Sequence, residues 1–488
     1  MADLHSAESL ASPSPSTVPC WDEQLIHRYN ITGPRYTSYP TAPQLSSSFT
    51  QSQQRQAMRQ SNLKRSPLSL YFHIPFCDTV CYYCACNKII TANKQHAAPY
   101  LKRLHKEMAM QSECLNSTRN NGWEGKRIVE QLHWGGGTPT YISDNQMREL
   151  MAQTRQHFCL LDDDSGDYSI EVHPGRMNVG TISVLRKLGF NRLSMGVQDF
   201  DRRVQQSVNR FNSIEQVDEL ISAARSAQFH SISMDIIYGL PHQTLSSIKT
   251  TLSQVIELSP DRLSLFNYAH MPHLFKTQLQ IDETALPTAE VKLQMLHYAS
   301  DTLCRAGYVY IGMDHFAKPH DSLVVAQQQG LLQRNFQGYS THGNCDLLAF
   351  GVSAISSLGN SLMQNYKTIV DYNRAIDTGV LPMSRGLTLS DDDLLRKQII
   401  MQLICQFSLN IAAIEAQFSI TFSEYFGEEL IALEPMVADG LIRLTPQEIV
   451  VMDRGRLLIR AICMVFDAYL KRENAPTDKQ KIRYSQVI

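Results

Sequence analysis

Strand-like and helix-like segments alternate along the chain from about residue 68 to residue 269. The strand-like runs are rich in β-branched and apolar residues and end in Gly, Pro or polar residues; they span residues 68–76, 128–136, 167–174, 191–198, 231–240 and 262–269. Apolar residues between two of these runs recur on one helical face, namely Val204, Val208, Val217, Leu220, Ile221 and Ala224. This alternation predicts an α/β fold with helices outside a parallel sheet, either open and doubly wound or closed as a full or partial barrel. Both forms place ligands at the carboxyl ends of the strands.

The two ends of the chain read differently from this central part. A chain of 488 residues exceeds the roughly 250–300 residues at which one hydrophobic core stops growing, so more than one domain is expected. Residues 1–20, rich in Ser and Pro, are expected to be disordered, and residues 21–67, which include "GPRYTSYPTA", to cover a barrel over 68–385. Over 386–488, a capping box of Ser390 and Asp393, a strand pair and an apolar helix over 457–470 predict a smaller, mostly helical, winged-helix-like C-terminal domain.

Composition limits the classes of partner and the compartment. A formal net charge of -2 and a pI near 6.8 give no electrostatic reason to expect a nucleic acid or an anionic membrane as partner. The sequence has neither a long apolar run nor a basic, hydrophobic N-terminus, so we predict no membrane span, no secretory signal and a cytoplasmic location. In a reducing compartment the 11 cysteines are expected to be thiols, metal ligands or redox groups.

Four of these cysteines lie in the short stretch "CDTVCYYCAC", directly after the first predicted strand. Cys77, Cys81 and Cys84 follow a C-x3-C-x2-C spacing that could bring three thiolates to one inorganic centre, and iron–sulfur clusters are held by such thiolates. The alternatives are a structural zinc site, which typically uses two well-separated ligand pairs, and thiols that are reactive or merely packed. With three cysteine ligands, a four-iron cluster would keep one open coordination site.

This loop, preceded by "HIP" and with an aromatic residue before its third cysteine, resembles the signature of the radical S-adenosylmethionine (SAM) enzymes. From about Trp21 to its end, the chain also resembles the bacterial oxygen-independent coproporphyrinogen III oxidases, in "GPRYTSYPTA", "LHWGGGTPTY", "FNRLSMGVQDF", "DIIYGLP", "FNYAHMP", "IGMDHFA", "NFQGYST", "GVSAIS" and "GRLLIRAICM". The resemblance implies a full or partial parallel (β/α) barrel of the radical SAM type. It further implies a 4Fe-4S cluster on Cys77, Cys81 and Cys84 with SAM on the fourth iron, and Cys86 as an additional, non-ligating cysteine.

Two SAM molecules are implied by the same resemblance. The positions that correspond to contacts with the SAM on the cluster are Tyr71, Gly136, Glu171 and Ile355. Those that correspond to contacts with the second SAM are Tyr83, Gly137, Thr138, Gln198, Arg210, Asp235 and Ala269. Without the resemblance, glycines more often serve tight turns, a lone carboxylate is more often a solvated charge or a helix cap, and Arg210 would be a surface ion pair.

Three positions depart from the family pattern. Tyr83 stands where Phe is common, Ala85 where Gly is common, and His173 where an Asp often follows the strand-end Glu. The first two are small changes that could alter packing around the second SAM. For His173 we expect a structural role.

The implied reaction converts two propionate side chains of coproporphyrinogen III to vinyl groups, which gives protoporphyrinogen IX in heme biosynthesis. A 5′-deoxyadenosyl radical from SAM would take a hydrogen atom from the β-carbon of each propionate, after which carbon dioxide and one electron leave. The implied partners are this substrate and an electron donor such as flavodoxin or ferredoxin, with no nucleic acid and a monomer as the default. Arg35 is a candidate for binding a propionate, with a structural role as its alternative.

Other functions are open to a chain of this kind. The nearest alternatives are a related radical SAM heme chaperone and a heme-degrading methyltransferase, against which Cys86 and "GPRYTSYPTA" favour the oxidase. A distant alternative is a winged-helix nucleic-acid-binding protein. The C-terminal segments "SDDDLL" and "FGEELIALE" make that tail too acidic to favour this reading.

Overall fold

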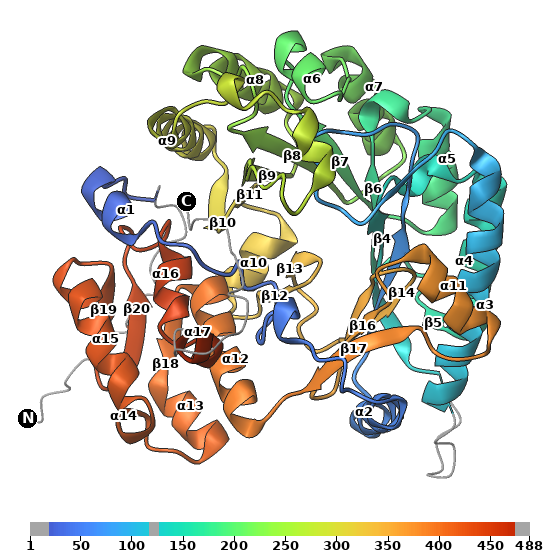
Figure 1. The fold of residues 1–488 in the computed structure, drawn as a ribbon. Helices are drawn as coiled ribbons and strands as arrows, with labels where there is room; N and C mark the ends of the chain where they lie inside the picture. Colours follow the sequence, from blue (N-terminus) through green and yellow to red (C-terminus); the bar gives the residue numbers. More distant parts are fainter. Residues whose placement is uncertain (1–18, 117–125, 474–488) are drawn as a thin grey trace, which may run out of the picture.

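A curved sheet wrapped by helices forms the core of the computed structural model, which describes residues 19–116 and 126–473 (Figure 1). Most of the segment predicted to be disordered, residues 1–18, therefore lies outside the described residues. The strand order is β10-β11-β9-β8-β7-β6-β4-β1-β14-β15-β16-β17. From β9 to β14 the strands are parallel: β1 (Leu68–Ile74), β4 (Ile128–Gly136), β6 (Asp167–Val172), β7 (Arg192–Gln198), β8 (Ser231–Tyr238), β9 (Arg262–Asn267) and β14 (Asp346–Phe350).

Antiparallel strands extend this sheet at both edges. They are β10 (Val309–Gly312) and β11 (His315–Ala317) at one edge, and β15 (Ile355–Leu358), β16 (Ser361–Asn365) and β17 (Met383–Thr388) at the other. The prediction of a partial parallel barrel is confirmed. Each of the six predicted strand runs contains an observed strand, because β-branched, apolar runs bounded by Gly and Pro suit strands that are buried on both faces.

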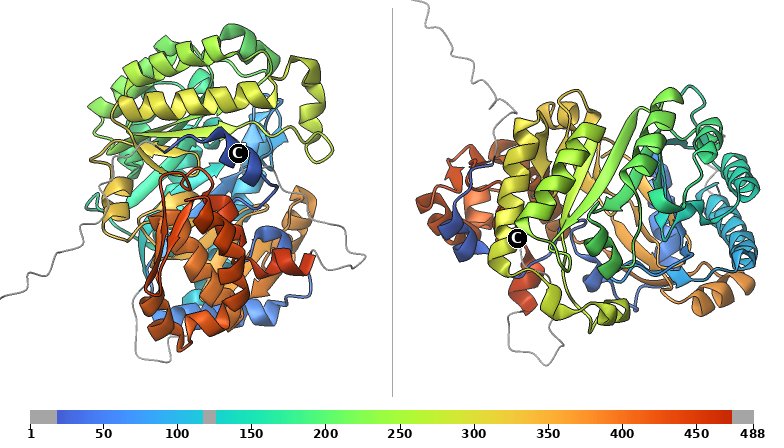
Figure 2. Two further views of the ribbon diagram at one scale, coloured as in Figure 1. Left: turned by 90° about the vertical axis from the view of Figure 1, so that its left-hand side faces the viewer. Right: turned by 90° about the horizontal axis from the view of Figure 1, so that it is seen from above.

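Helices cover the outside of the sheet, as two views at right angles show (Figure 2). They include α3 (Ala97–Asn116), α4 (Asp144–His157), α5 (Gly180–Leu188), α6 (Arg202–Ser207), α7 (Ile214–Ser226), α8 (Leu245–Leu258) and α9 (Ala289–Arg305). The prediction of one helical face from Val204 to Ala224 is wrong, because Ser213 starts a new helix with its own capping box. Val204 consequently packs in a separate small cluster with Leu240 and Tyr268.

The C-terminal part combines helices with a small antiparallel sheet of β18 (Ser408–Asn410), β20 (Glu448–Val451) and β19 (Ile442–Leu444). The predicted capping box at Ser390 is confirmed at the start of α12 (Asp391–Gln406). The single helix expected over 457–470 is wrong. It is split into α16 (Ile459–Met464) and α17 (Ala468–Glu473), because the Asp467 side chain accepts hydrogen bonds from the backbone N–H groups of Tyr469 (2.9 Å) and Leu470 (3.3 Å).

The segment over residues 33–42 runs between α1 (Glu23–Tyr29) and α2 (Gln51–Lys64) and lies against the C-terminal helices (Figure 1). The Tyr36 hydroxyl donates to Asp467 (2.9 Å), and the Tyr39 hydroxyl accepts from the N–H of Ala468 (3.1 Å). Both tyrosine side chains are buried. The segment therefore joins the barrel to the C-terminal helices. Among the described helices, none combines the length and apolar character needed to cross a bilayer.

Candidate functional site

The cysteine loop leaves the carboxyl end of β1 and is closed at its base by a short pair of parallel strands. These are β2 (Phe76–Cys77) and β3 (Ile89–Ile90), and the N–H of Ile89 donates to the carbonyl of Pro75 (2.7 Å). Because this pairing ties the two ends of the loop together, the cysteines are confined to a short excursion above the sheet.

One side of the loop contacts the glycine-rich end of β4. The N–H of Gly137 donates to the Ile74 carbonyl (2.9 Å), and the Thr138 hydroxyl donates to Cys77 Sγ (3.6 Å). A Cβ atom at position 137 would lie 2.7 Å from the backbone carbonyl of Pro75, so only glycine permits this approach. The "WGGGT" segment thus places Thr138 beside the first cysteine.

The other side of the loop contacts the segment after α6 and a nearby lysine. Arg210 Nη1 donates to Cys81 Sγ (3.7 Å), and Asn209 donates to the Val80 carbonyl (2.8 Å). Lys88 Nζ donates to the Cys84 carbonyl (2.7 Å). Two cations therefore lie beside the cysteines, where they favour bound thiolates.

The spacing of the thiols discriminates between the candidate inorganic centres. A tetrahedral zinc ion with bonds of about 2.3 Å needs ligand atoms within roughly 4 Å of one another. Among the described residues, the Cys, His, Asp and Glu side chains whose ligand atoms converge within 4.8 Å do not include the cysteines of this loop. The loop is therefore not a compact single-ion group, whereas iron–sulfur clusters are held by several Cys thiolates, as the motif of this loop offers.

Hydrogen bonding within the loop separates the roles of the last two cysteines. A hydrogen bond between the Cys86 and Cys84 side chains lowers the pKa of the Cys84 thiol and raises that of Cys86. Burial raises the pKa of Cys77 to about 11. Cys84 is therefore the more acidic member of the pair, and Cys86 is the hydrogen-bond donor beside it.

Three of the four residues expected to contact the SAM on the cluster, Tyr71, Gly136 and Glu171, form a group connected through His133. Glu171 accepts hydrogen bonds from the N–H of Gly136 (3.2 Å) and from His133 Nε2 (3.1 Å). Burial would raise the pKa of Glu171, but these hydrogen bonds and the His133 ring hold it below its usual value. The Tyr71 ring stacks on His133 with 5.8 Å between the ring centroids. Ile355 lies in β15, and no contact with this group is among those described for it.

His133 was missed by the sequence reasoning, although it lies in the quoted segment "LHWGGGTPTY". It lies two residues after Gln131 on β4, so both side chains point to the same face of the sheet and line the interior cavity. The period of two along a strand was the signal that could have identified it.

The residues expected to contact the second SAM come from several places: Gln198 ends β7 and Ala269 follows β9, Asp235 lies inside β8, and Tyr83 and Arg210 lie in the cysteine loop and after α6. Gln278 joins two of them, since its Nε2 atom donates to the carbonyls of Tyr83 (3.1 Å) and Ala269 (3.2 Å). Gln198 has a left-handed backbone with φ of 73°, and its Oε1 atom has no hydrogen-bond partner among the described residues. Burial raises the pKa of Asp235 to about 7. Unpartnered or neutral polar groups of this kind are what a polar ligand would satisfy.

His173, the position that departs from the family pattern, is buried close to Arg210. Burial, reinforced by the charges of Arg210 and Arg176, lowers the pKa of His173 to about 2. The side chain is therefore neutral at physiological pH, where an Asp would carry a negative charge.

A cavity of about 220 Å³ opens inside the curved sheet below these strand ends. Glu171 and Asp235 line its upper part, and Phe266, His315 and Tyr339 form an aromatic wall. The cavity combines a few polar groups with apolar surface, as ligand sites commonly do.

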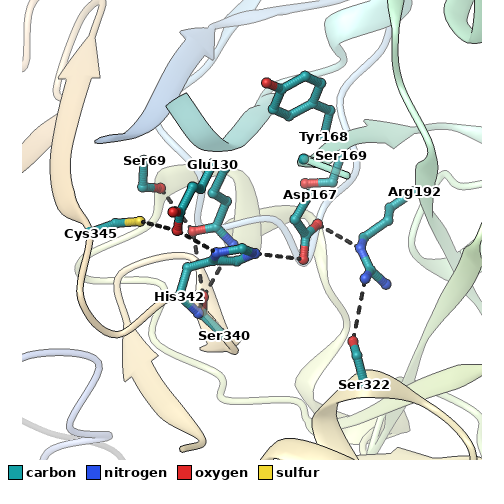
Figure 3. Close-up of polar contacts among 12 residues, drawn as sticks. Ser69, Glu130, Asp167, Tyr168, Ser169, Arg192, Ser322, Ser340, His342 and Cys345 are labelled. Carbon is teal, nitrogen blue, oxygen red and sulfur yellow. Dashed lines mark hydrogen bonds and ion pairs between the residues drawn. The ribbon is translucent and has the colours of Figure 1, made fainter. Parts of the chain in front are cut away.

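At the amino ends of the strands, Glu130, His342 and Cys345 form a second cluster with ligand atoms within 4.8 Å of one another (Figure 3). His342 Nδ1 lies 3.3 Å from Glu130 Oε2, to which the Cys345 thiol also donates (3.6 Å). On its other side, His342 Nε2 lies 3.8 Å from Asp167, which is paired with Arg192 at 2.6 Å. This floor cluster could in principle hold a single ion, but its groups already satisfy one another.

Comparisons with known proteins agree with this arrangement. The family model described as the radical SAM superfamily matches residues 71–255, and the model described as the HemN C-terminal domain matches residues 389–458. The oxygen-independent coproporphyrinogen III oxidase of Pseudomonas aeruginosa is 51% identical over 468 residues, which cover 96% of this chain and 99% of that protein. Its counterpart from Escherichia coli is 46% identical over 453 residues, which cover 93% and 96%.

The chain is also similar to a solved structure of this family. Coproporphyrinogen III oxidase (HemN) from Escherichia coli, described as a radical SAM enzyme, matches with a TM-score of 0.87 at 44% identity and covers 93% of this chain and 100% of that chain. The chain belongs to the oxygen-independent coproporphyrinogen III oxidase family within the radical SAM superfamily.

Proposed function

We propose that the protein converts two propionate side chains of coproporphyrinogen III to vinyl groups and so forms protoporphyrinogen IX without oxygen. The observation that carries this proposal is the cysteine loop, fixed at the carboxyl ends of the strands directly above a cavity with polar strand-end groups. The full-length similarity to oxygen-independent coproporphyrinogen III oxidases supports the same reaction.

As a radical SAM enzyme, the protein uses a 4Fe-4S cluster and SAM. Bound together, they supply a carbon-centred radical that can abstract a hydrogen atom from an unactivated carbon. We assign the cluster to Cys77, Cys81 and Cys84, the C-x3-C-x2-C residues of the loop at the carboxyl end of β1.

We assign a first SAM to Tyr71, Gly136, Glu171 and Ile355. Glu171 is held ionised by His133 and Gly136, so it can accept hydrogen bonds from an amino group or a ribose. A second SAM is assigned to Tyr83, Gly137, Thr138, Gln198, Arg210, Asp235 and Ala269. Support for this second site comes from the unpartnered Gln198 oxygen and from the closeness of Arg210 to the loop.

The other residues of the site would orient the substrate and exclude water. The cavity lies inside the curved sheet. The segment over 33–42 is hydrogen-bonded to the C-terminal helices, and we propose that together they cover the cavity. We divide the chain into an N-terminal covering segment over 21–67, a radical SAM barrel over 68–385 and a C-terminal helical domain over 386–488. We further propose a cytoplasmic monomer that receives electrons from flavodoxin or ferredoxin.

Anaerobic reconstitution tests the function. Iron and sulfide are measured first, followed by 5′-deoxyadenosine and protoporphyrinogen formed from coproporphyrinogen III. We expect cluster assembly, SAM cleavage and loss of two carboxyl groups per substrate. A protein that cleaved SAM and left the propionates intact would refute the proposed reaction, and would direct attention to the heme chaperone or methyltransferase alternatives.

A further inference from the structure

Two buried arginines and one half-buried arginine from distant parts of the chain meet beside the cavity. Arg35 belongs to the segment over 33–42, Arg334 to β12 (Gln333–Asn335) and Arg460 to α16. Figure 1 shows these three elements converging between the barrel and the C-terminal helices. The fold thus gathers positive charge at one internal position.

The three guanidinium groups differ in how well they are paired. Arg35 forms a close ion pair with Asp314. Arg460 donates to the backbone carbonyls of Pro34 (3.0 Å) and Gly33. Arg334, only 8% exposed, has no hydrogen-bond partner for Nε and Nη1 and no carboxylate in ion-pair range among the described residues.

Arg334 is oriented by an aromatic ring instead. Its guanidinium lies 4.6 Å from the centroid of the Tyr339 ring in β13 (Gly338–Ser340), with the geometry of a cation–π contact. Such a contact positions the guanidinium but leaves its donors free. A buried guanidinium with unused donors is costly, and a planar anion such as a carboxylate can satisfy it through two parallel hydrogen bonds.

The electrostatic environment reinforces this need for an anion. Burial and then the charge of Arg334 lower the pKa of Arg35 to about 10. At Arg460, burial followed by the charges of Arg35 and Arg334 lowers the pKa to about 9. The charge of Arg334 therefore disfavours the positive charges of Arg35 and Arg460, and an anion bound beside Arg334 would offset this.

Two cavities adjoin the cluster. Tyr339 and His315 line the 220 Å³ cavity that also contains Glu171 and Asp235. Tyr238, whose pKa rise on burial is partly offset by the charges of Arg35 and Arg460, lines a second cavity of about 320 Å³ beside Lys292. An anionic group here could belong to a ligand whose apolar body occupies the adjoining space.

We infer that Arg334, flanked by Arg35 and Arg460, binds a propionate carboxylate of coproporphyrinogen III. The inference rests on the proposed function, since it assigns part of the substrate site for that reaction. Coproporphyrinogen III carries four carboxylates on an apolar macrocycle, and the aromatic surface of Tyr339 beside the unpartnered guanidinium suits both features. The arrangement also explains why Arg334 remains unpaired inside the protein.

Binding of coproporphyrin III, the stable oxidised porphyrin with the same four propionates, tests the assignment by fluorescence titration of the anaerobic holoenzyme. We expect Arg334→Gln to weaken binding at least tenfold, and Arg334→Lys to weaken it less, because lysine keeps the charge but loses the planar fork. Chloride should weaken binding to the parent protein more than binding to Arg334→Gln. Equal affinity and equal salt dependence of the parent and Arg334→Gln would overturn the inference.

Arg396→Gln is the matched control, because the Arg396 guanidinium also lies over an aromatic ring (5.1 Å from the Phe426 centroid) but is paired with Asp392 and Glu429 and lines neither cavity. Its affinity for the porphyrin should stay within about twofold of the parent, and a tenfold loss there would contradict a specific role for Arg334. Iron content and substrate-free 5′-deoxyadenosine formation should be unchanged in Arg334→Gln, which shows that it folds. Failure of the proposed function has a different signature, since the parent itself would then neither bind the porphyrin nor decarboxylate the substrate.

Discussion

Two clusters with thiol groups lie at opposite ends of the same strands and differ in how their polar groups are satisfied. At the carboxyl ends, the pKa of the Cys84 thiol is lowered through its hydrogen bond with Cys86, and Arg210 and Lys88 add positive charge. At the amino ends, burial and then the charge of Glu130 raise the pKa of Cys345 to about 12. Burial raises the pKa of Cys77 to about 11 as it does at Cys345, so the two ends differ in the cations and the Cys86 partner beside the loop rather than in every thiol pKa.

The comparison also shows that closeness alone is a poor guide to a metal centre. The floor cluster satisfies the distance requirement for a single ion, yet Glu130, His342, Asp167 and Arg192 form a continuous chain of hydrogen bonds and ion pairs (Figure 3). The cysteine loop does not satisfy that requirement, although it carries the ligand motif. The floor groups thus hold one another in place, whereas the Gln198 oxygen and Arg210 Nε at the carboxyl ends have no hydrogen-bond partner among the described residues.

Replacing one thiol at each end tests most directly whether the two clusters differ in function. Cys84→Ser should lose its cluster and reduce protoporphyrinogen formation more than a thousandfold, because a serine hydroxyl is a poor iron ligand. Cys345→Ser should keep the iron and sulfide content of the parent, and so should Cys86→Ser. Iron analysis and absorption spectra after anaerobic reconstitution give the answer. Retention of the cluster by Cys84→Ser together with its loss from Cys86→Ser would reverse the assignment.

The next effect concerns a buried carboxyl group at the functional end. Burial raises the pKa of Asp235 in the folded protein to about 7, above its usual value in the unfolded chain. Below about pH 4 the carboxyl group is neutral in both states and the protein has its full stability, which is lost as the pH rises through 7. At about 1.4 kcal/mol per pKa unit, Asp235→Asn should be more stable than the parent at pH 8 by up to about 4 kcal/mol. It should also be less active if Asp235 binds SAM.

Thermal unfolding of both proteins at several pH values between 5 and 8.5 measures this effect. The difference in melting temperature should grow with pH up to about 7 and then level off. A difference that did not change with pH would mean that Asp235 is ionised in the folded protein.

A third prediction concerns affinity for SAM. In Glu171→Gln one oxygen becomes an amide NH₂ that must face the N–H of Gly136 or the ring of His133, so a hydrogen bond is lost and two donors oppose each other. If Glu171 also accepts hydrogen bonds from SAM, losing this charged acceptor costs about 1–3 kcal/mol of binding, a rise of roughly 5-fold to 150-fold in the dissociation constant for SAM. Equilibrium dialysis with labelled SAM measures it. Glu149→Gln, an exposed carboxylate on α4, is the control and should bind SAM as the parent does.

The smallest effect is expected at the floor cluster. Glu130→Gln replaces the charged acceptor shared by His342 and Cys345 with a neutral amide oxygen and should destabilise the protein by about 1–2 kcal/mol, with iron content and SAM cleavage unchanged. Melting temperature and iron analysis on the same sample measure both properties. Loss of iron or of SAM cleavage at unaltered stability would show that the floor also serves the chemistry.

The sequence allowed the strands of the barrel and the cysteine loop to be predicted because both are local signals. Runs such as residues 231–240 have strand composition and turn residues at their ends, and the cysteine spacing is contained in one loop. The division of the helical region into α6 and α7 was missed, because apolar spacing continues across Ser213 and only the capping box marks the new helix.

Contacts between distant parts of the chain could not be predicted in the same way. The pairing of Glu130 with His342 and the meeting of Arg35, Arg334 and Arg460 depend on the order in which strands and terminal segments pack. In one sequence, a buried arginine without a partner looks like any surface arginine. Only a structure shows that the side chain is buried and which hydrogen-bond partners it lacks, and these facts change the interpretation.

The pairing of β2 with β3 at the base of the cysteine loop has a consequence for the assembly and repair of the cluster. Because the base of the loop is closed by backbone hydrogen bonds and not by the cysteines, folding of the chain brings the two ends of the loop together and loses the chain entropy of closure. Zinc fingers differ in this respect, because they fold only when metal binds. A molecule that loses its iron to oxygen would thus keep a formed receptor, into which a new cluster can be delivered without refolding.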